Sequence, residues 1–140
     1  MIGAFDISTS GLVAQRVRLN AISSNLANMS TLRDENGEAA PYQARYPIFE
    51  TDTDKSTQYG AAGVKVASIE TEQLEPRYKY QPNHPLAIQQ GPRKGYVAYP
   101  NINMINEFTD ALEATRAYEA NIGVIEATKA MGAQTLRIVG

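Results

Sequence analysis

The chain has 140 residues, of which 13 are basic, 15 are acidic and none is cysteine. At roughly 150 residues per domain, this length fits one compact domain or a smaller one with appendages. The near-neutral charge argues against a nucleic-acid-binding protein, and the lack of cysteine excludes disulfides and thiolate metal sites. The single histidine, His84, excludes sites that need two histidines. No apolar run approaches the roughly 18 residues of a membrane helix, so we expect no direct membrane insertion.

Proline and tyrosine are unevenly distributed, which predicts three segments. All seven prolines and seven of the eight tyrosines lie between residues 41 and 100, and the first and last 40 residues contain no proline. Proline disfavours helix interiors, and tyrosine favours strands. We therefore predict an α+β fold. Residues 1–33 and 101–140 form long helices in a coiled-coil-like pair, and residues 34–100 form a small β-rich domain inserted between them.

The N-terminal segment predicts a helix over about residues 5–30. Large apolar residues recur every seven positions, as in the a/d stripe of a coiled coil. This N-terminal stripe comprises Phe5, Leu12, Leu19 and Leu26, with Ile22 and Met29 at the companion positions. A turn-rich run over residues 28–37 marks the end of the helix.

The C-terminal segment predicts a second helix over residues 103–138. Its apolar stripe recurs at alternating steps of four and three residues, which is again a helical period. This C-terminal stripe comprises Met104, Phe108, Ala111, Thr115, Tyr118, Ile122 and Ile125.

Each helix needs a partner, because a single stripe buries too little surface to offset the entropy of ordering the chain. In one interpretation the two helices pair within the chain, and in the other they pack against other subunits. Charge supports an approach of the two ends: residues 1–33 carry a net +2 and residues 101–140 a net −2. Opposite charges favour mutual approach, although a solvated surface gives the same count.

The middle segment predicts three or four short strands. Residues 42–49, 63–70, 77–80 and 95–99 combine strand-forming residues with alternation or flanking prolines. A polar loop lies between the first two, over residues 51–58. We expect a small sheet or an open barrel with a modest core.

No catalytic constellation is present in the sequence, and no cofactor or metal is predicted. His84 lies between prolines, where we expect a turn residue whose ring bonds locally rather than a general base. Four tyrosines and four basic residues at positions 77–99 resemble a platform for single-stranded nucleic acid. The nine acidic and seven basic residues of segment 34–100 argue against that function.

Asn25 and Asn28 are the remaining polar feature, because asparagine is a poor residue for a helix interior. Three positions apart, they share one flank of the first helix. Two interpretations stay even: a fraying helix end, or hydrogen bonds across a helix–helix interface that fix its register.

Three motifs, in order along the chain, carry a resemblance to a known family. They are Ser24-Asn25-Leu26-Ala27-Asn28, the run from Tyr80 through Pro85 to Gly95-Tyr-Val-Ala-Tyr-Pro-Asn-Ile-Asn, and Ala114-Thr-Arg-Ala-Tyr-Glu-Ala-Asn. Together they resemble the flagellar axial proteins, which are the rod, hook and hook-associated subunits, and among these the proximal rod subunits. The resemblance covers nearly the whole chain.

The resemblance implies a non-enzymatic subunit of the flagellar rod, which polymerises into a helical tube and transmits torque toward the hook. It implies export through the flagellar type III apparatus without a cleaved signal peptide, and a location in the periplasm-spanning rod of the basal body. Implied partners are further copies of the chain, the rod subunits FlgB, FlgF and FlgG, and FliE; no nucleic acid is implied. The alternatives are another axial subunit such as FlgB, a small β-domain binding adaptor, or an enzyme using His84.

The residues expected at subunit interfaces come from both stripes and from the asparagine pair. They are Leu12, Leu19, Ile22, Asn25, Leu26, Asn28, Met29, Phe108, Ala111, Thr115, Tyr118, Ile122 and Ile125.

Overall fold

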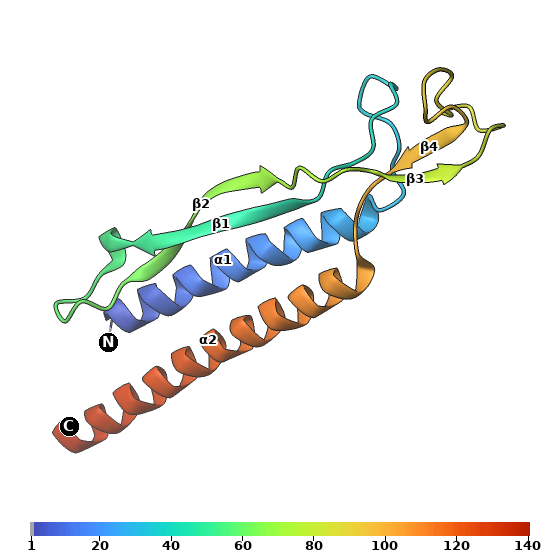
Figure 1. Cartoon of the computed structure of the whole chain (residues 1–140). Helices are drawn as coiled ribbons and strands as arrows, with labels where there is room; N and C mark the ends of the chain where they lie inside the picture. Colours follow the sequence, from blue (N-terminus) through green and yellow to red (C-terminus); the bar gives the residue numbers. More distant parts are fainter. Residues whose placement is uncertain (1) are drawn as a thin grey trace.

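The computed structural model describes residues 2–140, so that Met1 of the predicted first segment lies outside the described residues. The chain is α+β, as predicted from the sequence. In chain order its elements are α1 (Ile2–Ala27), β1 (Arg45–Asp52), the 3-10 turn η1 (Thr53–Lys55), β2 (Gly63–Thr71), β3 (Arg77–Tyr80), β4 (Tyr96–Tyr99) and α2 (Met104–Val139). Figure 1 shows an elongated molecule in which the two helices run along its length.

The boundaries of α2 follow from its sequence. The side chain of Asn103 caps the helix by accepting hydrogen bonds from the backbone N–H groups of Ile105 and Asn106. Glu107 in the first turn and Arg137 in the last complement the helix dipole. With 36 residues, α2 is about 54 Å long, which exceeds the 26-residue α1.

The two helices are antiparallel neighbours. Contacts join Gly11 to Asn121 near one end and Asn25 to Glu107 near the other. Because α2 is longer, its C-terminal end projects past the N-terminus of α1 (Figure 1). The large side chains on this projecting end, Met131, Leu136, Ile138 and Val139, are exposed.

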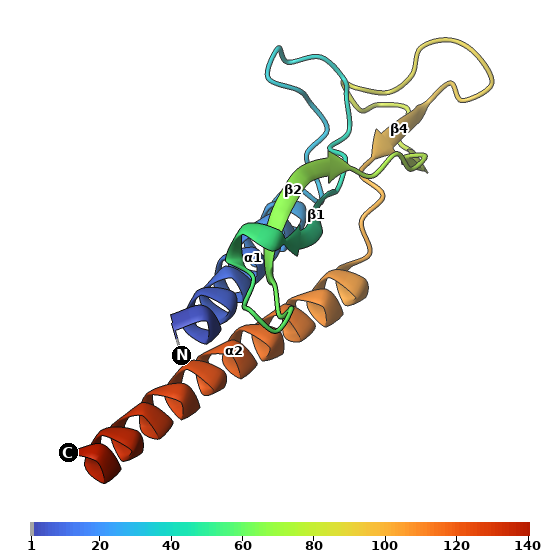
Figure 2. The ribbon, with the colours of Figure 1, turned by 90° about the vertical axis from the view of Figure 1, so that its left-hand side faces the viewer.

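The hairpin β1–β2 packs along α1. Its antiparallel register runs from Arg45 opposite Thr71 to Asp52 opposite Gly63, with an irregularity after Ile48. Figure 2, turned by 90° from Figure 1, shows the hairpin and α2 on different sides of α1. The hairpin is therefore part of the body that the helices form.

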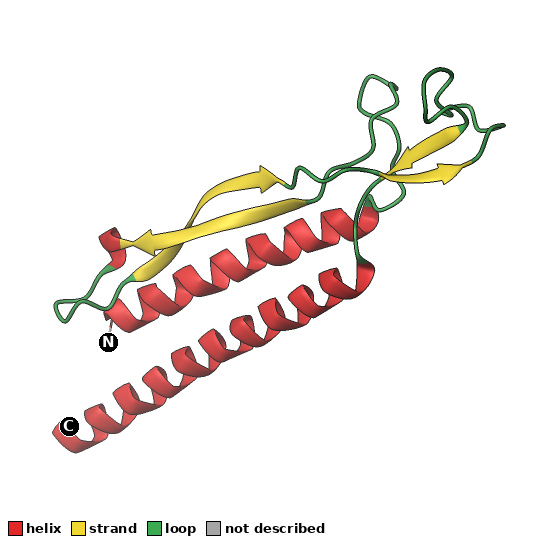
Figure 3. Ribbon diagram, viewed as in Figure 1, coloured by secondary structure: helices red, strands yellow, loops and turns green. Residues whose placement is uncertain are grey.

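The strands β3 and β4 form a second, separate antiparallel ladder beyond the ends of the helices (Figure 3). Its core is Val97, which is 1% exposed. The expected single sheet or barrel is thus wrong: the four strands make two ladders of two strands each among the described residues. After β2 the chain continues through Pro76, which offers no N–H to a ladder, and leaves the edge of the first sheet.

Candidate assembly surface

Small residues line the contact between α1 and α2. Ala14 and Ala114 are 1% and 0% exposed, and Ala114 is the one fully buried residue of α2. A Cβ atom on Gly11 would lie 2.8 Å from Asn121 Nδ2, so the glycine permits a close approach at this point. The helices meet through small side chains, while most large apolar side chains of α2 lie elsewhere on its surface.

Ion pairs support the same contact. Arg18 of α1 lies 3.4 Å from a carboxylate oxygen of Glu113 and 3.8 Å from one of Asp110. The expected attraction between a basic first helix and an acidic second one is therefore present within the chain. Both carboxylates are more than half exposed, so each pair contributes at most about 1 kcal/mol.

Asn25 joins three segments of the chain. Its side chain is buried, with 3% of the residue exposed. The amide Nδ2 donates to the backbone carbonyl of Arg45 at 2.9 Å and to Glu107 at 3.3 Å. The carbonyl Oδ1 accepts from the backbone N–H of Arg45 at 2.8 Å and from the hydroxyl of Tyr42 at 3.1 Å. These bonds link α1 to β1 and to α2, which matches the interpretation of Asn25 as a residue that fixes register.

Asn28 makes local contacts at the end of the helix, which is the other interpretation that the sequence left open. Its Nδ2 donates to the carbonyl of Ser24 at 2.9 Å, and its Oδ1 accepts from the hydroxyl of Thr31 at 3.0 Å. Both partners are local, so Asn28 supports the turn that follows α1. The helix accordingly ends at Ala27, three residues before the end predicted near residue 30.

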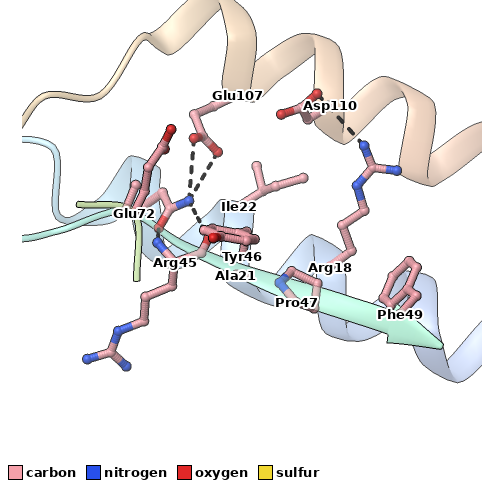
Figure 4. A pocket seen from close by; sticks show the side chains of 12 residues that line it. Arg18, Ala21, Ile22, Arg45, Tyr46, Pro47, Phe49, Glu72, Glu107 and Asp110 are labelled. Atoms are coloured by element: carbon pink, nitrogen blue, oxygen red, sulfur yellow. Dashed lines mark hydrogen bonds and ion pairs between the residues drawn. The ribbon is translucent and has the colours of Figure 1, made fainter. Parts of the chain in front are cut away.

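A groove lies between α1, β1 and α2, and Figure 4 shows the side chains that line it. Tyr46, Pro47 and Phe49 come from β1, and Glu107 and Asp110 come from α2. Burial raises the pKa of the Glu107 carboxyl above its ordinary value of 4.5, and the nearby charges of Asp110 and Glu72 raise it further. The hydrogen bond from Asn25 acts in the opposite direction.

The large residues of the N-terminal stripe lie beside the line of helix contact. Gly11, Arg18 and Asn25 contact α2, whereas Leu12, Leu19 and Leu26 each follow one of them by one residue. One residue corresponds to about 100° of rotation around a helix. These three leucines are half-buried, as is Met29, while Ile22 is buried.

Three residues of the C-terminal stripe are displaced in the same way. Glu107, Ala114 and Asn121 face α1, whereas Phe108, Thr115 and Ile122 each follow one of them by one residue. Phe108 is 57% exposed, Ile122 is 37% exposed and Thr115 is exposed. The other residues of this stripe that were expected at an interface, Ala111, Tyr118 and Ile125, are half-buried.

The displaced residues of both stripes, which are Leu12, Leu19 and Leu26 on α1 and Phe108, Thr115 and Ile122 on α2, lie on one side of the helix pair. Ile22 instead lines the groove between α1, β1 and α2. In two antiparallel helices that face each other, a rotation of the same sense and size from each contact line leads to the same side. The hairpin lies on the other side, because Ser10 and Ser24, one residue before Gly11 and Asn25, contact it and the segment leading to it. Ser10 Oγ accepts from the backbone N–H of Val64 at 3.0 Å, and Ser24 Oγ lies 2.9 Å from Tyr42 Oη. We call the side that carries these six displaced residues the apolar side.

The residues that make the contact between α1 and α2 also recur with a seven-residue period, which the search for apolar stripes did not detect. Gly11, Arg18 and Asn25 are seven apart, as are Glu107, Ala114 and Asn121. Because these residues are small or polar, a search for large apolar side chains passes over them. Their shared period, together with small side chains such as Gly11 and Ala114 in the two rows, is the sequence signal for this contact face.

Comparisons with known proteins identify the family. A family described as "Flagella basal body rod protein" matches residues 5–33, and one described as "Flagellar basal body rod FlgEFG protein C-terminal" matches residues 93–138. The chain is 37% identical to the flagellar basal-body rod protein FlgC of Borreliella burgdorferi, with 99% of this chain and 97% of the relative covered. The chain belongs to the FlgC family of flagellar basal-body rod proteins.

The chain is similar to FlgC proteins of other bacteria as well. The chain is 37% identical to FlgC of Salmonella typhimurium, with 99% of the chain and 97% of the relative covered. It is 35% identical to FlgC of Bacillus subtilis, with 96% and 95% covered. As an FlgC protein, the chain is a structural subunit of the flagellar rod, located in the basal body and associated with other rod components. No helix within residues 2–140 has both the length and the apolarity needed to cross a membrane.

Proposed function

We propose that this FlgC chain packs against neighbouring rod subunits through the apolar side of its helix pair. The observation that carries the proposal is the exposure of Phe108 and Ile122 beside a half-buried leucine row on α1. The internal contact between the helices uses other residues, so these side chains stay available for neighbours. Burying them between subunits would contribute about 25 cal/mol per Å² of apolar surface.

The division of the chain follows from this geometry. Residues 1–33 and 101–140 form the helical part that faces the interior of the tube, and residues 34–100 form the outward part. The hairpin β1–β2 supports this orientation because it covers the side of α1 opposite the apolar side. A contact in which one surface meets a different surface of the next copy does not close and so extends a helical assembly.

The proposed neighbours are further copies of this chain, FlgB, FlgF, FlgG and FliE, all reached after passage through the flagellar type III export apparatus without a cleaved signal peptide. This list rests on membership of the family. The proposed role includes no catalysis. The single histidine, His84, uses its Nδ1 to accept the backbone N–H of Leu86 at 3.0 Å, as expected for a turn residue.

The test is a charge placed on the apolar side. Ile122→Asp, expressed in cells that lack the native chain, should abolish rod assembly and motility while circular dichroism of the purified protein stays unchanged. Ala127→Asp places the same charge on an exposed residue of another side of α2 and should preserve motility. Normal motility of Ile122→Asp would refute the proposed surface, and so would equal loss of motility in both variants.

A further inference from the structure

The ladder β3–β4 and its connecting loop form a basic unit at one end of the molecule. We call residues 77–99 the tip. The tip contains four basic residues, Arg77, Lys79, Arg93 and Lys94, and no Asp or Glu. The rest of the chain therefore contains 9 of the 13 basic residues and all 15 acidic ones, a net charge of −6. The overall charge of −2 conceals a separation of charge between tip and body.

The structure separates most of these charges in space as well as in sequence. Residues 32–41, which carry Asp34, Glu35 and Glu38, lie against the tip, because Leu32, Ala39 and Pro41 line one cavity with Tyr78 and Val97. With this segment counted, the tip end carries a net +2 and the rest of the chain a net −4. The tip extends beyond the end of the helix pair, whereas the hairpin and the helices form the body (Figure 1). All nine acidic residues of segment 34–100 precede Arg77. The near-neutral charge of this segment is therefore the sum of an acidic part, residues 34–76, and the basic tip. Such a sum conceals a positive surface of the kind that attracts an acidic partner.

The conformation of the tip is ordered by its own contacts. The backbone N–H of Gly95 donates to Ile88 at 2.8 Å, and the backbone N–H of Ile88 donates to Tyr96 at 2.9 Å. Gly95 has a φ of 85°, which favours glycine at this turn. A Cβ atom there would lie 2.8 Å from the ring of Tyr80. The loop therefore presents its charges from a defined shape.

The tip fits an acidic protein surface better than a nucleic acid. The guanidinium of Arg93 lies 3.8 Å from the ring centroid of Tyr78, and Lys79 Nζ lies 4.7 Å from that of Tyr99. These cations cover two of the rings that would stack on bases. The body, at −4, would also repel a phosphate backbone.

From this charge separation we infer that the basic tip docks on the acidic body of a second copy of this chain. The contact joins unlike surfaces, so one copy uses its tip and the other its body. It is separate from the apolar side of the helix pair. Exposed Tyr80, which lies edge-on to Tyr96 with ring centroids 5.2 Å apart, adds apolar area beside the charges. Charge sets the orientation and the rate of such an encounter.

The experiment measures salt-dependent association of the full chain by sedimentation velocity. Wild type should associate at low ionic strength and dissociate as salt screens the contact, since the Debye length falls from about 30 Å at 0.01 M to about 3 Å at 1 M. Lys79→Glu with Lys94→Glu should weaken this association at least tenfold. The matched control, Arg16→Glu with Lys55→Glu, changes the net charge equally at exposed positions in the body. It should associate at least as strongly as wild type, because it makes the body more acidic and leaves the tip unchanged.

Mixing identifies the two surfaces. The Lys79→Glu, Lys94→Glu variant has a tip of zero net charge. A labelled trace of this variant should bind wild type, because its acidic body still receives a wild-type tip, yet it should not bind itself. Association of this variant with itself at wild-type strength would overturn the inference and assign self-association to the apolar side instead. Wild type that stays monomeric at low salt would also overturn it, as would stronger binding of the tip to a single-stranded oligonucleotide than to a second copy.

Discussion

The side chain of Asn25 satisfies both backbone polar groups of Arg45, donating to its carbonyl at 2.9 Å and accepting from its N–H at 2.8 Å. A side-chain amide thereby takes the place of a neighbouring strand at the first residue of β1. Because Asn25 also donates to Glu107, one residue of α1 determines the positions of the hairpin and of α2. The spatial relation of the two stripes on the apolar side depends on this link.

Replacing Asn25 should destabilise the chain. Asn25→Ala removes two part-buried hydrogen bonds to the backbone of Arg45, each of which contributes about 0.5–1.5 kcal/mol. Urea unfolding followed by circular dichroism measures the change. Asn20→Ala, on the exposed face of the same helix, is the matched control and should change the free energy of unfolding by less than about 0.5 kcal/mol. Equal stability of the two variants would show that the link to Arg45 contributes nothing.

Glu107 should make stability depend on pH with a defined sign. Its pKa is raised in the folded chain, so between the ordinary value and the raised one the folded state binds more protons than the unfolded state. Stability therefore falls as pH rises through this window. Glu107→Gln removes the titration, keeps an acceptor for Asn25, and should gain stability relative to wild type as the pH rises from the ordinary value of 4.5 through the raised pKa.

The matched control for this titration is Glu126→Gln, which removes an exposed carboxylate from the same helix. Unfolding is followed by denaturant titration at a series of pH values. If the difference between wild type and Glu107→Gln were constant across the range, or changed in the opposite direction, burial of the carboxylate would not dominate its environment.

The contact between the helices should not tolerate added volume. Ala114 is 0% exposed, and Ala114→Leu inserts three carbon atoms where small residues meet. Overpacking of this kind costs about 1–3 kcal/mol and would push the helices apart. Thermal unfolding measures the loss, and Ala120→Leu, at an exposed position of the same helix, should be nearly neutral. Unchanged unfolding of Ala114→Leu would show that the helices do not pack closely at this residue.

The helices were predictable from the sequence because their periods and boundaries are local properties. The expected ranges, 5–30 and 103–138, differ from α1 and α2 by one to three residues at each end. The electrostatic attraction between the two ends was also predictable, because the net charge of each terminal segment can be counted in the sequence. Arg18, Asp110 and Glu113 contribute to those charges and form the ion pairs that the structure shows. The strands near residues 63–70 and 77–80 were located through alternation of apolar and polar residues.

The faces that the helices use against each other were not predictable from apolar periodicity. A stripe of large side chains shows that a face needs burial, but it does not say whether the partner belongs to the same chain. Here Leu19 and Phe108 remain beside the contact, while Gly11 and Ala114 make it. The division of the strands into two ladders was hidden for a related reason, because pairing depends on segments far apart in the sequence.

The most direct test of the apolar side is the accessibility of one thiol in assembled rods. The chain has no cysteine, so Thr115→Cys introduces a single, exposed thiol in the middle of the C-terminal stripe. Tyr59→Cys, at a residue that is 92% exposed beside the hairpin, is the control. Both thiols should react rapidly with a maleimide in the monomer. In purified basal bodies, we predict that the thiol at position 115 is protected at least tenfold while the thiol at position 59 still reacts. Reaction at position 115 in rods at the rate of the monomer would contradict packing of neighbouring subunits on the apolar side.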